Sequence, residues 1–363
     1  MTLTKHKKNP RQNETERLIT LAQATQSDDF SPQEGRLADL VSRLIARGSD
    51  RSIERALDYL GVHGDLEAAA RILFWAEDAA STMDIIVSPD KVSSDPTIAE
   101  LTCFLVPLVF ITPSSFTLPL NIPLTETLNQ LAQSFRQHHL IDALPTLILL
   151  PHLYRLQDLP STWSARYQWL QQLLAAASSQ PYHLPPPSLE PENSSTSEHS
   201  ATIHLRFLLG AVVLDSEVSH RPLWDQDIPW EESDTMYSHG SAWQDTVIAL
   251  LQQVLPDTIV LPDLPDLWSD ALTSSLNLWN HVVLDTTWDW FCRESAAPPE
   301  AVVADVRWVP EEPAWSVTFA TPFYRGPTWL WMCPDDPVQE RHQLLDALHD
   351  HNISRIQLDM RDL

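Results

Sequence analysis

The chain has 363 residues, of which 43% are hydrophobic, as is typical of a globular protein with room for two domains. Its formal net charge is −26. Residues 1–60 hold 10 of the 23 basic residues but only 9 of the 49 acidic residues, so the rest of the chain is strongly acidic. Direct binding of nucleic acid or of an anionic membrane is therefore not expected. Its seven glycines form no G-x-G-x-x-G, G-x-x-x-x-G-K-[ST] or G-x-S-x-G motif, which excludes phosphate loops, dinucleotide turns and nucleophile elbows.

The N-terminal region is expected to be helical after a short tail. Residues 1–12 are polar and basic, without the apolar core of a secretory signal, and predict a flexible tail. From residue 13 to 80 apolar residues recur at spacings of three and four, as in Leu37, Leu40, Val41 and Leu44, which predicts a small helical bundle.

Residues 81–177 predict a first α/β unit with the order strand, helix, strand, helix. The apolar runs at 101–112 and 144–151 are too short to span a membrane and are typical of buried strands. Amphipathic helices are expected at 123–138 and 161–177. Residues 178–200, rich in proline and serine, predict a linker to the rest of the chain.

Residues 201–363 predict a second α/β domain, acidic and rich in tryptophan. The order recurs as strand 205–214, helix 241–254, strand 258–261 and helix 264–282. The segment 144–153 resembles 255–264, which indicates an internal duplication, and the alternative is two similar turns that arose by chance. The C-terminus has α+β character, with strands at 302–309, 315–320 and 328–333, a hairpin turn at 324–327, a helix at 337–350 and a last strand at 353–360.

The densest group of polar side chains is the loop from Asp215 to His239. Its carboxylates and imidazoles are ligands that divalent metals use, so Asp225, Asp227 and His239 are candidate metal ligands. Their spacing matches no metal-binding template, and the alternative is a solvated acidic loop. His152 is a further candidate, because it follows the second strand, where α/β sheets place ligands.

Tryptophan is in excess, with 11 of the 14 residues at or after position 224. Trp224 and Trp230 lie among the carboxylates of the acidic loop, and Trp288 and Trp290 flank Asp289. These four are candidate partner-binding residues, since tryptophan is enriched at binding hot spots and a ring beside carboxylates suits a cationic ligand. The alternative is that such rings belong to the core.

Segments spread along the chain share one resemblance. They are Glu16-Arg-Leu-Ile-Thr-Leu-Ala, residues 37–60, Val106-Pro-Leu-Val-Phe-Ile-Thr-Pro-Ser, residues 147–159 and Trp329-Leu-Trp-Met-Cys-Pro. In this order they resemble an uncharacterised bacterial protein family known only as a domain of unknown function. The resemblance implies an α/β bacterial cytoplasmic protein with no assigned activity.

The interpretation we favour is a non-enzymatic cytoplasmic scaffold or regulatory protein that binds a basic protein through its acidic, tryptophan-rich C-terminal half. The three scattered cysteines suit a reducing cytosol. One alternative is a metal-assisted hydrolase that uses carboxylates and histidines of residues 215–239, and a second is a nucleic-acid mimic. No cofactor is predicted, and a divalent metal belongs only to the hydrolase alternative.

Overall fold

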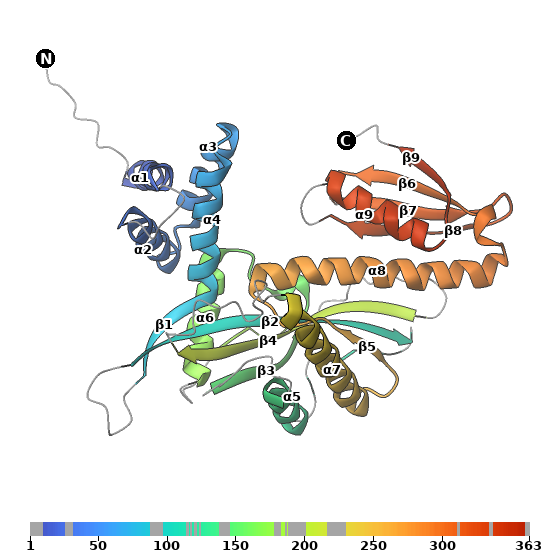
Figure 1. The fold of residues 1–363 in the computed structure, drawn as a ribbon, viewed down its shortest axis with the longest axis horizontal. Helices are drawn as coiled ribbons and strands as arrows, with labels where there is room; N and C mark the ends of the chain where they lie inside the picture. The colour runs from blue at the N-terminus through green and yellow to red at the C-terminus, as the bar shows by residue number, and fades with distance from the viewer. Residues whose placement is uncertain are drawn as a thin grey trace, which may run out of the picture.

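The computed structural model describes residues 10–25, 32–87, 97–113, 116, 118–119, 122, 125–137, 146–177, 183–185, 187, 201–215, 230–310, 313–333 and 337–359. A helical unit at the N-terminus stands on a central sheet, and a second sheet is stacked on the long helix α8 that runs along the first (Figure 1). The fold is therefore mixed α/β, as the sequence predicted.

The N-terminal unit contains four helices among the described residues, packed around one apolar core. Gly48 and Gly64 have φ of 67° and 73°, which ends α2 and α3 in the left-handed region that favours glycine. The Asp65 carboxylate then caps α4 by accepting from the amide of Ala68. The elements are α1 (Pro10–Ala24), which begins inside the predicted tail, α2 (Pro32–Ala46), α3 (Asp50–Val62) and α4 (Leu66–Ser81).

Within the described residues, five antiparallel strands form the central sheet in the order β1-β2-β4-β3, with β5 on the same edge of β2 as β1. The long strands β2 and β4 pair along 99–113 and 201–215, and both faces of this pair are buried, which explains their unbroken apolar sequence. The strands are β1 (Thr82–Val87), β2 (Thr97–Pro113), β3 (Thr146–Tyr154), β4 (Ala201–Asp215) and β5 (Ile259–Pro262).

The two predicted units follow the expected order, but their strands share this one sheet. β3 of the first unit pairs with β4, and β5 of the second pairs with β2. Leu149 of β3 and Val260 of β5 occupy the same position in the two similar segments. Leu149 pairs with Gly210 of β4, and Val260 pairs with Phe110 of β2. Gly210 and Phe110 each lie three residues from the central pair Pro107–Phe207, so the two pairings are symmetric about it. Each unit therefore pairs its second strand with the first strand of the other unit. The β2–β4 pair thereby has a partner strand on each outer edge, which provides backbone hydrogen bonds there.

Helices of the two units cover the sheet in matching pairs. α5 and α7 share a core on one face with Leu208, Val212 and Phe104, whereas α6 and α8 share a core on the other with Phe207 and Leu209. Their bounds are α5 (Thr125–Gln137), α6 (Trp163–Ala177), α7 (Trp230–Val254) and α8 (Trp268–Ser295).

The C-terminal sheet has the order β8-β7-β6-β9, in which β6 and β9 are parallel and the other pairs antiparallel. The turn lies at 321–324 rather than at the predicted 324–327. The Thr321 hydroxyl accepts from the amide of Tyr324 at 3.0 Å, and Gly326 is needed inside β8 because a Cβ there would lie 2.9 Å from the Phe291 ring. The elements are β6 (Val303–Val309), β7 (Ala314–Ala320), β8 (Arg325–Met332), α9 (Pro337–Asp350) and β9 (Arg355–Asp359).

Candidate functional site

The predicted metal ligands are not assembled by the part of the chain that the structure describes. Asp225 and Asp227 lie outside the described residues, and His239 is placed only as a backbone position within α7. His152 lies in β3 at an irregularity of the strand pairing, where partial burial lowers the pKa of its imidazole and its ring meets Tyr154 edge-on. No group of three His, Cys, Asp or Glu side chains that could hold a metal ion occurs among the described residues.

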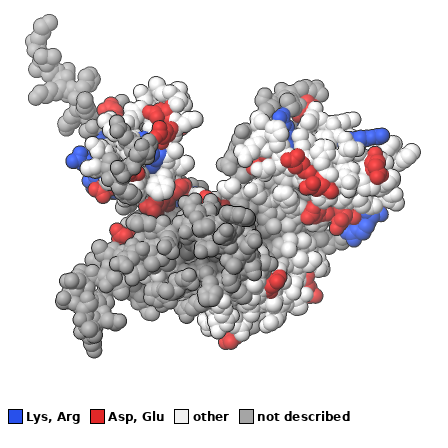
Figure 2. All heavy atoms as spheres, in the orientation of Figure 1, with Lys and Arg blue, Asp and Glu red and all other residues white. Residues whose placement is uncertain are grey.

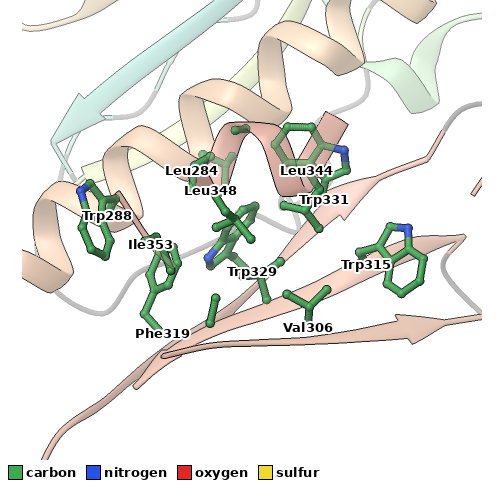
Figure 3. Packing of buried hydrophobic residues seen from close by; sticks show 14 of the residues in the cluster. Leu284, Trp288, Val306, Trp315, Phe319, Trp329, Trp331, Leu344, Leu348 and Ile353 are labelled. Atoms are coloured by element: carbon green, nitrogen blue, oxygen red, sulfur yellow. The ribbon is translucent and has the colours of Figure 1, made fainter. Parts of the chain in front are cut away.

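The tryptophans that can be placed belong mainly to the core. Trp288 is 8% exposed and packs on Phe291 and Phe319, and Figure 3 shows its ring, with those of Trp329 and Trp331, in the space between α8, α9 and the sheet. A ring buried in this way stabilises the fold and is not presented to a partner. Trp224 lies outside the described residues, and Trp230 is placed only as the first residue of α7.

Trp290 is the remaining candidate, and it lies half-buried near the hairpin turn of the C-terminal sheet. Its ring is 6.2 Å from that of Tyr324, whose pKa is raised by desolvation and by the nearby charge of Glu294. The neighbouring Phe323 at the tip of the turn is 98% exposed. The sequence pattern missed Phe323 because it placed the turn three residues too late.

The described part of the acidic C-terminal half carries carboxylates on the outer sides of α8 and α9. Figure 2 shows acidic side chains gathered over these two helices on the face that it draws. Asp285 and Asp289 are exposed four residues apart on α8, and Asp346 and Asp350 have the same spacing on α9. We call these four residues the acidic face. Like charges at this spacing repel across one helical turn, but Asp285 also lies beside His351, and Asp289 has Arg293 four residues further along α8.

A polar contact between His351 and Asp285 joins the two helices of the acidic face. Nε2 of His351, just after α9, lies 3.0 Å from Oδ1 of Asp285, and Nδ1 lies 2.9 Å from the carbonyl oxygen of Ala347. The same ring meets Trp288 edge-on. The histidine thus connects the end of α9 to Asp285 on α8.

A second group of polar side chains attaches the N-terminal helices to the central sheet. The carboxylate of Glu77 in α4 accepts from Nε1 of Trp163 at 2.8 Å, from Arg166 at 2.6 Å and from the hydroxyl of Ser269. In parallel, Asp50 of α3 accepts from the hydroxyl and amide of Ser164. Each acid therefore sits near the N-terminus of α6 or α8, where helix dipoles favour negative charge.

Two further carboxyl groups near the start of α8 have raised pKa values. Burial raises the pKa of Asp266 to about 6, and Asp263 and Asp270 add repulsion, against the opposing hydrogen bond from the amide of Leu267. Burial and then the charge of Glu77 raise the pKa of Asp270. These shifts follow from packing at the junction of the helical unit and the sheet.

A hollow of about 230 Å³ lies where the start of β4 meets α8 and the short 3-10 helix η1 (Leu156–Asp158). Arg155, Arg206 and His204 contribute polar groups, and Trp279 contributes apolar surface. The Arg155 guanidinium is held by the carboxylate of Asp158 at 3.0 Å. The sequence analysis did not predict this group. The signal was present, because Arg206 interrupts the apolar run 205–214 and His204 directly precedes it.

Comparison with known proteins gives one match. Residues 3–313 match the model of a family described as "Protein of unknown function (DUF2863)". The chain belongs to this family. The match runs from the first helices through the central sheet to the end of β6, so it includes the resembling segments up to residue 159, whereas the segment that begins at Trp329 lies beyond it. Neither the curated proteins nor the solved structures give a significant match. Among the described residues, no helix is both long and apolar enough to cross a membrane.

Proposed function

We propose that the protein is a non-enzymatic cytoplasmic scaffold or regulatory protein, and that the acidic face on α8 and α9 binds a basic segment of a partner protein. The observation that carries this proposal is the pairing of exposed carboxylates four residues apart on two adjacent helices. Exposed carboxylates grouped in this way attract cations, and a Lys- or Arg-rich segment would pair with them. The three cysteines are free thiols, as suits a reducing compartment.

The proposal departs from the sequence interpretation in one respect. The partner contacts carboxylates and not a tryptophan surface, because the tryptophans whose side chains can be placed in this half are buried or half-buried. The mimic alternative receives less support, since the face drawn in Figure 2 carries basic as well as acidic side chains.

The test is the salt-dependent binding of a fluorescent lysine- and arginine-rich peptide to two matched variants. One variant neutralises three residues of the acidic face, and the control neutralises three exposed acids elsewhere, so that both have the same net charge. The first carries Asp289→Asn, Asp346→Asn and Asp350→Asn, and the second carries Asp245→Asn, Asp257→Asn and Glu300→Gln.

We expect the first variant to bind about tenfold more weakly than the wild type, which corresponds to about 1.4 kcal/mol, and the control to bind nearly normally. The first variant should also be more stable by about 0.2–0.5 kcal/mol, because it removes two like-charge pairs but also loses the favourable spacing of Asp289 and Arg293. Equal losses in the two variants, or binding that ignores salt, would reject the acidic face as the site.

A further inference from the structure

The strand β9 forms an open edge of the C-terminal sheet. It pairs in parallel with β6 on one side, and among the described residues no strand pairs with its other side. Figure 1 shows β9 on the rim of this sheet that lies away from α8. Such an edge presents backbone N–H and C=O groups to any chain that can add a strand.

The opposite edge of the same sheet is protected, whereas β9 is not. β8 contains Pro327, which has no backbone N–H to donate, and a register shift interrupts the pairing of β8 with β7. β9 contains no proline, glycine or lysine, and its pairing with β6 is regular along all 5 residues. A further strand can therefore add at β9 without distortion of the sheet.

The apolar side chains of β9 favour a second copy of the same strand. The register with β6 places Ile356 and Leu358 on the side of the sheet that faces its core, beside buried residues of β6. Leu358 is nevertheless 43% exposed, and among the described residues no strand lies beyond β9 to cover it. In an antiparallel pair centred on Gln357, Leu358 of each copy lies directly opposite Ile356 of the other, and this cross-strand contact buries it.

The charged side chains of β9 fit the same register. Arg355 and Asp359 each lie two residues from Gln357, so in this antiparallel pair Arg355 of each copy lies opposite Asp359 of the other. Arg355 is exposed and makes no ion pair within the described part of the chain. Opposite charges in such cross-strand positions stabilise a sheet, and like charges destabilise it. The sequence of β9 is thus complementary to its own reverse.

Charges of alternating sign already cross the outer face of this sheet. The carboxylate of Asp305 in β6 pairs with Arg307 at 3.1 Å and with Arg325 of β8 at 3.2 Å. The strand register then places Arg307 beside Asp359 of β9. Arg355 of a second copy would follow on the other side of Asp359, so this row would continue to alternate and no two like charges would meet.

We propose that β9 pairs with β9 of a second copy of the chain, antiparallel about Gln357, so that two C-terminal sheets join into one continuous sheet. The arrangement is two-fold symmetric, as in most homodimers. β9 carries one positive and one negative charge, so it is neutral within a chain of net charge −26. Such short strands bury less than the roughly 1,200 Å² of a standard interface, so the dimer is weak, with a Kd on the order of 10 μM or higher. The acidic face takes no part in this pairing, so either proposal can fail without the other.

Charge reversal on β9 tests the register. Arg355→Asp and Asp359→Arg each place like charges opposite each other at both ends of the pair, and we expect each to weaken dimerisation about tenfold or more in sedimentation equilibrium. The double variant restores opposite charges at the wild-type net charge and should dimerise like the wild type. An equal mixture of the two single variants should also dimerise, because each supplies the charge that the other needs.

A cysteine substitution detects the dimer even where it is weak. In the proposed register Gln357 lies opposite itself, with Cα atoms about 4.5–5.5 Å apart, a distance that a disulfide can bridge. Gln357→Cys in a Cys292→Ala background should therefore cross-link two chains under mild oxidation. The control Ser354→Cys is also exposed but would lie about 20 Å from its counterpart, so it should not cross-link.

The substituted residues of β9 are exposed or half-buried at the edge, so the denaturation midpoints of the variants should match that of the wild type. A wild-type chain that stays monomeric at about 100 μM, together with equal cross-linking at residues 354 and 357, would overturn the proposal. A dimer that Asp359→Arg strengthens would also overturn it, because net charge and not the register would then control association. A dimer that neither charge reversal affects would place the contact on another surface, with the same consequence.

Discussion

Side chains of two neighbouring strands approach Gly210 of the central sheet closely, which yields a strong prediction. Gly210 in β4 lies between Phe104 of β2 and Leu149 of β3. A Cβ at this position would lie 2.6 Å from Cε2 of Phe104 and 2.9 Å from Cδ2 of Leu149, both well inside van der Waals contact. Gly210→Ala therefore forces the Phe104 ring or the strands to move.

The expected cost is at the upper end of the range for overpacking, about 2–3 kcal/mol, because Phe104 is fully buried and has no free space to enter. Chemical denaturation followed by tryptophan fluorescence and by far-UV circular dichroism would measure it, with coincident transitions required for a single free energy of unfolding. Gly61→Ala in α3 is the matched control, because open space surrounds Gly61 and alanine favours a helix by about 0.8–1 kcal/mol.

A second substitution can show that the Phe104 ring is the cause. Phe104→Leu shortens the side chain, so the double variant Gly210→Ala, Phe104→Leu should be more stable than the sum of the single effects predicts. If Gly210→Ala lay within about 0.5 kcal/mol of the wild type, the pairing of β2, β4 and β3 at this position would be incorrect.

Three further predictions concern other parts of the molecule. Because the pKa of Asp266 is raised to about 6, the folded protein binds an extra proton between about pH 4 and 6, and its free energy of unfolding should fall as pH rises through this window. Asp266→Asn should remove this pH dependence, which denaturation curves at several pH values would measure. Glu77→Ala should cost about 1–3 kcal/mol, because partly buried donors lose their acceptor, and limited proteolysis should then cut between the helical unit and the sheet. Burial raises the pKa of Cys103 and of Cys333 to about 12, so a thiol reagent should modify Cys292 first and the other two only after unfolding; rapid modification of Cys103 in the native protein would contradict its placement.

Local patterns were sufficient for most elements of the fold. Spacings of three and four predicted the N-terminal helices, and the apolar runs predicted β2 and β4, since each pattern reflects which faces are buried. The edge strand β1 was not predicted, because Thr82–Val87 alternates too briefly to stand out. The helix α8 also extends to Ser295, well beyond the expected end at 282, because Trp288 and Phe291 gain a core only from the second sheet.

The candidate sites were less accessible to sequence reasoning. The acidity of the C-terminal half was plain from composition, but the choice of Asp285, Asp289, Asp346 and Asp350 depended on which helices lie side by side. Glu77 resembles any solvated acid of a helix, and its partners Trp163 and Ser269 are distant in the sequence. Leu66, Leu73 and Phe74 follow the same helical spacing as residues of the bundle core, but they are exposed on α4.

The sequence by itself determined the class of the protein, most of its strands and helices and the sign of its charge, because these depend on composition and on periodicity over a few residues. Only the tertiary structure decided that two similar units exchange strands within one sheet, that the tryptophans lie inside, and that an apolar side of α4 and four carboxylates lie outside. Those outcomes depend on contacts between residues far apart in the chain, where the free energy of burial is shared among several elements and no local pattern records the partner.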